Sequence, residues 1–306
     1  MKPKVLVIVG PTAVGKTDLS IKLAQHFDGE IISGDSMQVY RHLDIGTAKV
    51  TPAERQDVPH FLIDERDVQG TFTVADFVER ASVLITQIGQ RQHLPIIVGG
   101  TGFYLQALLT GLKLGTPANT AFRTHWQQLA VTNGNQWVWQ QLAERDTLAA
   151  QKIPAGNVRR VIRALEVYET TGHSIEQQED HPNRYNALAV GLNTERAQLY
   201  NRINQRVDVM MQSGLENEAR WLYEQGGPSL QAGHGIGYKE FFPYFNHDIT
   251  LTTAVESLKQ NSRHYAKRQL TWFRHQMAVS WYDLVNQPAE LGQIEVQTAD
   301  WLGSKA

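Results

Sequence analysis

The sequence predicts an α/β protein, with a parallel sheet covered by helices and a mostly helical insertion. In the first hundred residues short apolar runs alternate with stretches of helical periodicity, a pattern typical of parallel strands joined by helices. Several of these runs end in segments rich in glycine and polar residues, as at ligand-binding sheet edges. Residues 115–185 then show helical composition without any strand signal.

Four apolar runs support the strand prediction in the first part of the chain. The first, Val5–Val9, and the fourth, Ile96–Val98, consist largely of β-branched residues and end at glycine. Between the runs, apolar side chains recur at the spacing of one helix face. We therefore expect strands at residues 5–9, 31–32, 61–63 and 96–98, and helices at residues 17–27 and 73–88.

The composition changes after about Gly115. The following stretch is rich in Gln, Ala, Arg and Trp, and its helices are expected to pack around Trp126, Trp137 and Trp139. Beyond it we expect a strand at 187–192, helices at 199–225 and 251–274, and a peripheral tail after Gln287. The predicted organisation is a core of residues 1–114 and 186–306 that carries an insertion of residues 115–185.

Composition excludes several classes of protein. The chain has 306 residues, of which 42% are hydrophobic and 20% charged, as in globular domains. It lacks cysteine, so disulfides, thiolate zinc sites and a cysteine nucleophile are excluded. No segment approaches the ~20 apolar residues of a membrane span, and the run at Val5–Val9 is too short for a signal peptide. We expect a cytoplasmic protein without a membrane partner, and its net charge of −2 gives no global basic field for nucleic acid.

Residues 10–17 match a phosphate-binding pattern in full. The run Gly10-Pro11-Thr12-Ala13-Val14-Gly15-Lys16-Thr17 fits G-x-x-x-x-G-K-[ST], after a predicted strand and before a predicted helix. In such loops backbone N–H groups converge on phosphate oxygens at a helix N-terminus. Lys16 supplies a positive charge, and Thr17 supplies a hydroxyl ligand for Mg²⁺. The core is therefore expected to be a P-loop NTPase-like sheet.

The phosphate loop does not name the reaction, because kinases, ATPases, GTPases and other transferases share it. A hydrolase would also need a metal-holding carboxylate at a strand end. Asp64 follows the third apolar run, but the run is short and a charged segment continues from it, so we interpret Asp64 as surface-facing.

Two other polar segments follow predicted strands. Asp35 comes after the second run, next to Ser36 and Gln38, which can hydrogen-bond to base edges, and Gln suits adenine. A lone Asp at a strand end is also a common turn residue. Thr101 lies among the glycines of residues 99–102, where it either presents a hydroxyl to a ligand or belongs to a tight turn. With the phosphate loop, these segments outline one site.

Basic residues gather in three places. The first is in the insertion, at Arg159-Arg160-Val161-Ile162-Arg163. A run of this kind is usually a solvated helix face. Residues 259–275 contain five Lys and Arg without an acid, interleaved with aromatics, which favours RNA over an ordinary amphipathic helix. Arg202 and Arg206 lie four residues apart and either clamp a diphosphate or form an exposed stripe.

Together these segments resemble one family, the bacterial tRNA dimethylallyltransferases, also called tRNA isopentenyltransferases. The matching segments occur in order along most of the chain: residues 10–17, 35–41, 44–49, 59–60, 72–77, 99–105, 163–167, 235–240 and 266–274.

The resemblance implies transfer of a dimethylallyl group from dimethylallyl diphosphate to N6 of the adenosine 3′ of the anticodon, position 37, with Mg²⁺. Asp35 would be the general base, Thr101 would contact the diphosphate, residues 12–17 would hold it, and Arg206 would neutralise it as it leaves. The insertion would grip the anticodon stem-loop of the tRNA, and the enzyme is expected to act as a monomer. The implied tRNA contacts are Asp35, Ser36, Met37, Gln38, Thr101, Arg123, Arg159, Arg160, Val161, Ile162, Arg163, Lys267, Arg268 and Arg274.

Two other functions use the same features. A small-molecule or nucleoside kinase would use the phosphate loop for ATP and need no RNA. An RNA-binding switch that senses phosphate without catalysis would not need Asp35 for any activity.

Overall fold

The protein is represented by a computed structural model that describes residues 2–112, 118–177 and 183–304. It divides into two compact units, Met1–Thr110 with Asn183–Ala306 and Gly111–Pro182. Composition placed these divisions after residues 114 and 185, and the first of those positions lies outside the described residues.

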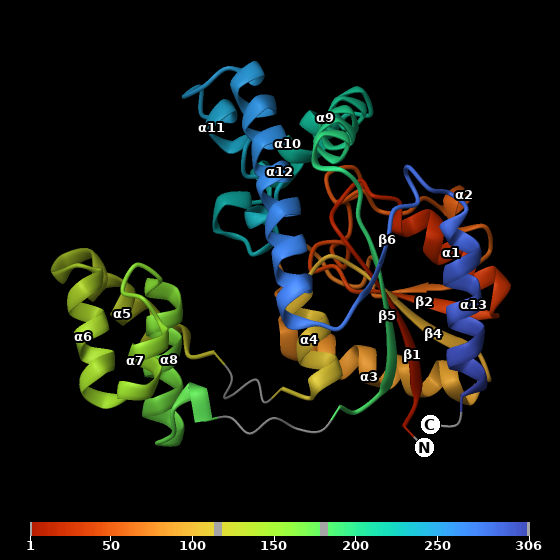
Figure 1. Cartoon of the computed structure of the whole chain (residues 1–306). Helices are drawn as coiled ribbons and strands as arrows, with labels where there is room; N and C mark the ends of the chain where they lie inside the picture. Colours follow the sequence, from red (N-terminus) through yellow and green to blue (C-terminus); the bar gives the residue numbers. More distant parts are fainter. Residues whose placement is uncertain (1, 113–117, 178–182, 305–306) are drawn as a thin grey trace. The chain divides into compact units, whose positions relative to one another are not determined.

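The first unit is built on one parallel sheet (Figure 1). Every strand pair in the described part of this sheet is parallel. The predicted α/β class is therefore confirmed. The six strands, in the spatial order β3-β2-β4-β1-β5-β6, are β1 (Lys4–Val9), β2 (Gly29–Ser33), β3 (His60–Phe61), β4 (Leu94–Val98), β5 (Asn186–Leu192) and β6 (Ser280–Tyr282).

Both faces of this sheet are buried, which explains the continuous apolar runs. In β1, Val5 and Val7 pack in a cluster with helices α3 (Val74–Gln90) and α4 (Gly102–Thr110). The alternate residues Leu6 and Ile8 pack in a second cluster with α1 (Lys16–His26) and α13 (Glu290–Gly303).

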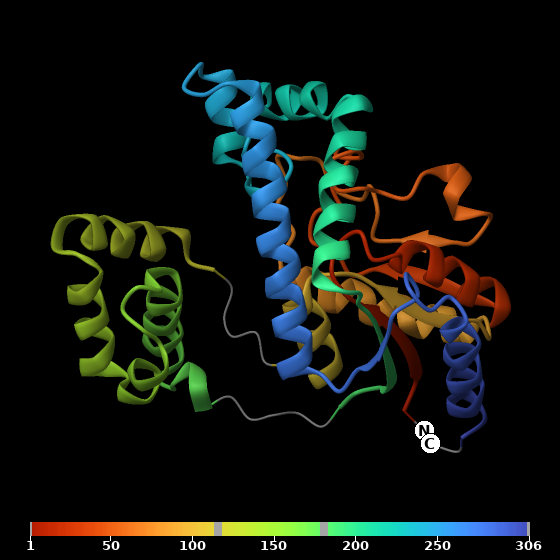
Figure 2. The ribbon, with the colours of Figure 1, turned by 45° about the horizontal axis from the view of Figure 1, so that its top comes forward.

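Two long helices stand beside the carboxyl ends of the strands (Figure 2). They are α9 (Arg196–Gln212) and α12 (Leu251–Gln276). The helix predicted at 199–225 is in fact two helices, because Gly214 at φ 99° ends α9 and starts α10 (Leu215–Glu224). The short helices of this unit are α2 (Pro52–Arg55), α11 (Phe242–Phe245) and 3₁₀ turns at Gly227–Ser229 and Ala232–His234.

Two sequence-based expectations were wrong. The tail after Gln287 is not peripheral: Ile294 and Thr298 of α13 are fully buried, whereas Gln293, Val296 and Asp300 of the same helix are exposed. The third strand is only His60–Phe61, because Leu62 adopts a left-handed backbone at φ 60° and ends the pairing.

The second unit is helical throughout its described residues. Its core joins Val138, Leu142, Val161, Ile162 and Leu165, and the three predicted tryptophans pack partly buried against it. Its elements are α5 (Thr120–Asn133), α6 (Asn135–Arg145), α7 (Thr147–Lys152), α8 (Val158–Thr171) and a 3₁₀ turn at Ile175–Gln177. In neither unit is any described helix long and apolar enough to cross a membrane.

Candidate active site

The phosphate loop joins β1 to α1, as predicted. Gly15 is the N-cap of α1 and has φ 98°, a left-handed conformation that favours glycine. Gly10 has φ 139°, and a Cβ there would lie 2.4 Å from the carbonyl oxygen of Leu192 on β5. The two glycines of the motif are therefore required by the backbone.

Lys16 turns back over the loop. Its Nζ donates hydrogen bonds to the carbonyl oxygens of Gly10, at 3.0 Å, and Pro11, at 2.6 Å. Burial, together with the nearby charge of Arg206, lowers the pKa of Lys16 to about 7. An anion bound in the loop would favour the charged form of this amine.

The loops after β2 and β4 are joined directly. The N–H of Gly34 donates to the carbonyl oxygen of Val98 at 2.8 Å, and the N–H of Ser36 donates to Oγ1 of Thr101 at 3.1 Å. Because β2, β4 and β1 are neighbours in the sheet, the three polar loops predicted to form one site do meet at one edge.

Asp35 is held with one oxygen engaged. Its Oδ1 accepts hydrogen bonds from the backbone N–H groups of Met37, at 2.8 Å, and Gln38, at 3.4 Å. Its Oδ2 accepts none from the described residues. Burial raises the pKa of Asp35, although these amides and the charges of Lys16 and Arg206 oppose the shift. The carboxylate is therefore a stronger base than an ordinary aspartate, with one oxygen ready to accept a proton.

Helix α9 brings two arginines to the phosphate loop. Nε of Arg202 donates to the carbonyl oxygen of Ala13 at 2.8 Å. Arg206 makes no hydrogen bond or ion pair with any described residue. Burial lowers the pKa of Arg206, yet a guanidinium stays protonated in proteins. A cation without a partner beside Lys16 suits a diphosphate.

Three side chains of α12 line the site and were not predicted to do so. Gln269 contacts both the phosphate loop and Gly100, and the hydroxyl of Tyr265 donates to the carbonyl oxygen of Gly100 at 3.4 Å. The indole of Trp272 packs on Gly102. The sequence did contain a signal for Gln269, which is three residues after Ala266 and four before Phe273 on the buried face.

The structure revises the proposal that α12 stacks bases. Tyr265 and Trp272 face inward, so they are not free platforms for RNA. Lys259 is paired with Asp208 of α9 at 2.7 Å, and Nη1 of Arg263 donates to Oδ1 of Asn204 at 2.6 Å. Two of the five basic residues in 259–275 are thus engaged by α9, Lys259 in an ion pair and Arg263 in a hydrogen bond.

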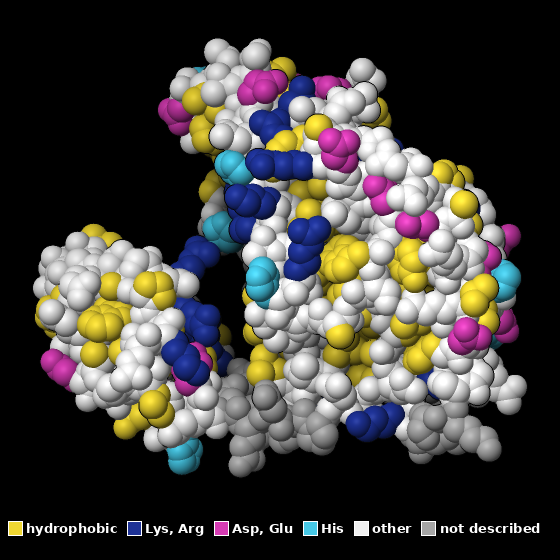
Figure 3. Space-filling view, viewed as in Figure 1, with side chains coloured by type: hydrophobic (Ala, Val, Ile, Leu, Met, Phe, Trp, Pro, Cys, Tyr) yellow, Lys and Arg dark blue, Asp and Glu magenta, His cyan; other side chains and the backbone are white. Residues whose placement is uncertain are grey.

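The outer face of α12 remains basic. Lys267, Arg268 and Arg274 are exposed. Lys and Arg side chains gather in Figure 3 over the part of the surface where α12 lies in Figure 1. This surface suits phosphate contacts rather than base stacking.

Gln38 is engaged within the protein. Its Oε1 accepts from Oγ of Ser33 at 2.9 Å, and its Nε2 donates to the carbonyl oxygen of Thr47 at 3.2 Å. The amide therefore ties the Asp35 segment to residues 47–48, and an adenine edge would have to displace one of these bonds.

In the second unit the predicted RNA contacts separate into two groups. Arg159 and Arg160 of α8 are exposed, whereas Val161 and Ile162 are buried and cannot offer their side chains to RNA. Arg123 and Arg163 both donate to the buried carboxylate of Glu166. Burial opposes ionisation there, but these bonds lower the pKa of Glu166, so the two arginines hold the unit together.

The residues at the phosphate loop fit Mg²⁺ only in company with a phosphate. No cluster of three or more His, Asp or Glu residues that could hold a metal occurs in the described parts of the chain. Thr17 is exposed at the first turn of α1 and offers one hydroxyl. Mg²⁺ commonly takes one or two protein ligands together with substrate phosphates and water.

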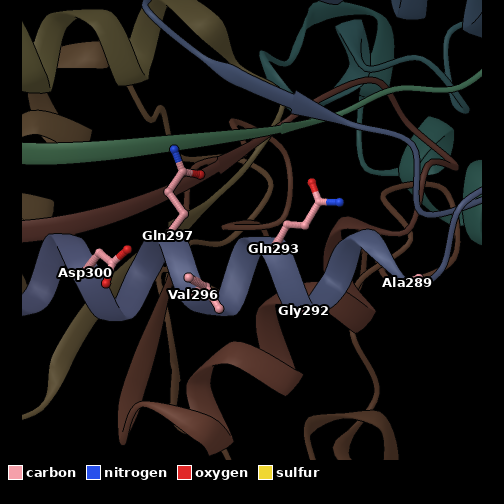
Figure 4. Close-up of a pocket in the computed structure, with 6 residues that line it drawn as sticks. All are labelled: Ala289, Gly292, Gln293, Val296, Gln297 and Asp300. Atoms are coloured by element: carbon pink, nitrogen blue, oxygen red, sulfur yellow. The ribbon is translucent and has the colours of Figure 1, made fainter.

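A surface hollow along α13 contains none of these residues. Figure 4 shows that its lining comes from this helix and its N-cap Ala289, with Gln293, Val296, Gln297 and Asp300 among its residues. The hollow is therefore not the candidate active site.

The fold and the site define a class: an α/β protein with a phosphate loop, in which the charges of Lys16 and Arg206, which would hold a phosphorylated substrate, act on a partly buried carboxylate. Residues 38–276 match the IPP transferase family, and the chain belongs to it. A tRNA dimethylallyltransferase of Levilactobacillus brevis is 57% identical over 304 residues, which are 99% of each chain.

Two solved structures agree with this assignment. The full-length tRNA isopentenylpyrophosphate transferase of Bacillus halodurans is 45% identical and aligns with a TM-score of 0.76 over 98% of this chain and 97% of that one. A eukaryotic dimethylallyltransferase acting on tRNA is 29% identical and aligns with a TM-score of 0.83 over 99% of this chain and 80% of that one. The predicted family is confirmed.

Proposed function

We propose that this protein transfers a dimethylallyl group from dimethylallyl diphosphate to N6 of adenosine 37 in tRNA. The observation that carries the proposal is Asp35, a partly buried carboxylate with a raised pKa and an unengaged oxygen, close enough to Lys16 and Arg206 for their charges to act on it. The names of the similar proteins support the same reaction. No observation favours the kinase alternative.

In this reaction N6 attacks C1 of the dimethylallyl group, and the C1–O bond to the diphosphate breaks. Oδ2 of Asp35 takes the N6 proton as the new C–N bond forms. Lys16, Arg206 and the backbone N–H groups of the phosphate loop stabilise the charge of the departing diphosphate. Thr101, whose Oγ1 accepts a hydrogen bond from the N–H of Ser36, would contact the diphosphate. Bound Mg²⁺, held by Thr17 and the diphosphate, would neutralise further leaving-group charge.

The tRNA partner would be held by the basic surfaces. Lys267, Arg268 and Arg274 on α12, with Arg159 and Arg160 on α8, are exposed and suit the phosphates of an anticodon stem-loop. The target base must leave its stack to reach the sheet edge, at a cost of a few kcal/mol, so a grip on the surrounding RNA is needed. We further propose that the enzyme acts as a cytoplasmic monomer.

The test is transfer of label from dimethylallyl diphosphate to unmodified tRNA in the presence of Mg²⁺. Label should appear at adenosine 37 and be absent from the same tRNA with guanosine there. Asp35→Asn should lower the transfer rate by about 10²–10⁴-fold, the usual contribution of a general base, while tRNA still binds. Asp67→Asn, an exposed aspartate paired with Arg41, is the matched control. A wild-type protein that binds tRNA and transfers no label would refute the proposal.

A further inference from the structure

The inner face of α12 lies against two of the three site loops. Gln269 and Trp272 project from this face toward Gly100 and Gly102, whereas Lys267 and Arg268 project outward. The approach is close, since a Cβ on Gly100 would lie 1.9 Å from Nε2 of Gln269. A glycine is therefore needed at position 100 for the helix to reach the loop.

Gln269 uses both ends of its amide. Its Nε2 donates to the carbonyl oxygen of Gly100 at 3.0 Å, and its Oε1 accepts from the backbone N–H of Thr12 at 3.2 Å. The side chain is 5% exposed, so water cannot readily replace either bond. One buried side chain thus bridges the loop after β1 and the loop after β4.

Gln269 is the side chain that links the phosphate loop, residues 10–17, to residues 99–102. Strands β1 and β4 pair as far as Ile8 and Val98, and the N–H of Gly99 donates to the carbonyl oxygen of Ile8. Beyond that point, no described residue of 10–17 hydrogen-bonds directly to a residue of 99–102. The separation of the two loops therefore depends on Gln269.

We propose that Gln269 is a positioning residue that sets the phosphate loop against the Thr101 loop, and so the diphosphate against the segment that binds the adenine. Resting on the function proposed above, this assigns the N–H of Thr12 to Gln269 and leaves phosphate oxygens to the later N–H groups of the loop. The connection continues to the base, because Oγ1 of Thr101 accepts from the N–H of Ser36, next to Asp35.

Two substitutions test the two hydrogen bonds of Gln269, to Thr12 and to Gly100. Gln269→Leu has similar size and removes both bonds. Gln269→Glu keeps an acceptor for Thr12 but loses the donor to Gly100. Gln260→Leu, at an exposed position on the same helix, is the matched control. For each variant we would measure the melting temperature, the tRNA Kd, and kcat and the KM for dimethylallyl diphosphate.

Gln269→Leu should lower kcat about 100-fold and raise the KM, because small displacements of reacting groups have effects of this size. Gln269→Glu should also lower kcat and raise the KM, because its carboxylate keeps the contact with Thr12 but repels both the carbonyl oxygen of Gly100 and the diphosphate. Both should bind tRNA like the wild type. If Gln269→Leu does not fold, Gln269→Glu decides alone.

Wild-type kcat in Gln269→Glu would overturn the inference, as would a loss of tRNA affinity parallel to the loss of transfer. If the wild type and Gln260→Leu transfer nothing, the proposed function has failed instead. The two failures are therefore distinguishable.

Discussion

The pKa of Lys16 predicts that affinity for dimethylallyl diphosphate decreases as the pH rises above 7. In the free enzyme burial lowers this pKa to about 7, so the amine is charged below that pH and neutral above it. The bound diphosphate favours the charged form, so above pH 7 binding must be accompanied by proton uptake. The decrease in affinity above pH 7 therefore reflects the titration of Lys16 in the free enzyme.

The size of the effect follows from the protonated fraction. For a pKa of about 7 this fraction is about one half at pH 7 and about one hundredth at pH 9, so Kd should rise about 50-fold between them. At pH 8 about 0.9 proton should be taken up for each ligand bound. The ligand adds little, because a terminal phosphate has its second pKa near 6.

Calorimetric titration in buffers of different ionisation enthalpy measures both quantities. Lys16→Met should bind weakly, and its Kd should hardly change over the same range. A wild-type Kd that changes less than about threefold from pH 7 to 9, where the full effect is about 50-fold, would refute the reasoning. So would the same pH dependence in Lys16→Met.

Three other predictions concern separate parts of the molecule. The raised pKa of Asp35 in the free enzyme should place the acid limb of kcat/KM above the pKa of an ordinary aspartate, ~3.9, with activity lost as the pH falls through it; a pH–rate profile checks this. Lys267→Ala and Arg268→Ala should each reduce the salt slope of tRNA binding by about one, whereas Lys259→Ala, already paired with Asp208, should change it less; equal slopes for all three would count against the phosphate contacts. Ile294→Ala should destabilise the fold by about 2–5 kcal/mol in chemical denaturation, while Val296→Ala, at an exposed position on the same helix, should stay within about 0.5 kcal/mol; similar values would mean that α13 is peripheral after all.

The parts of the site that could be predicted from the sequence are those encoded within a few residues. Gly10, Gly15 and Lys16 are placed by a short motif between a strand and a helix, so their spacing alone determines their geometry. Asp35 and Thr101 follow strands, and parallel strands bring their carboxyl ends to one edge. Local pattern and topology together were sufficient here.

The parts that could not be predicted depend on partners from distant segments. Lys259 belongs to a basic stretch in sequence but meets Asp208 of α9 in the fold. Arg123 was expected to contact RNA, yet it pairs with the buried Glu166. The role of Gln269 depends on two loops more than 160 residues away from it in sequence. Single-sequence patterns do not contain these pairings.

The different surroundings of Asp64 and Asp35 explain how a phosphate loop can serve the transfer of a carbon group. Asp64 follows β3, which lies at the edge of the sheet and is separated from β1 by β2 and β4, and its Oδ1 accepts from Nζ of Lys49 at 2.6 Å. The side chain of Lys49 is 4% exposed and also binds Asp44, so this carboxylate is committed to the fold. The carboxylate that acts on the charge of Lys16 is instead Asp35, whose raised pKa and unengaged oxygen suit it to take a proton from an amine. The loop can then hold a diphosphate that leaves from carbon, because the carboxylate that its charges act on is suited to serve the nucleophile.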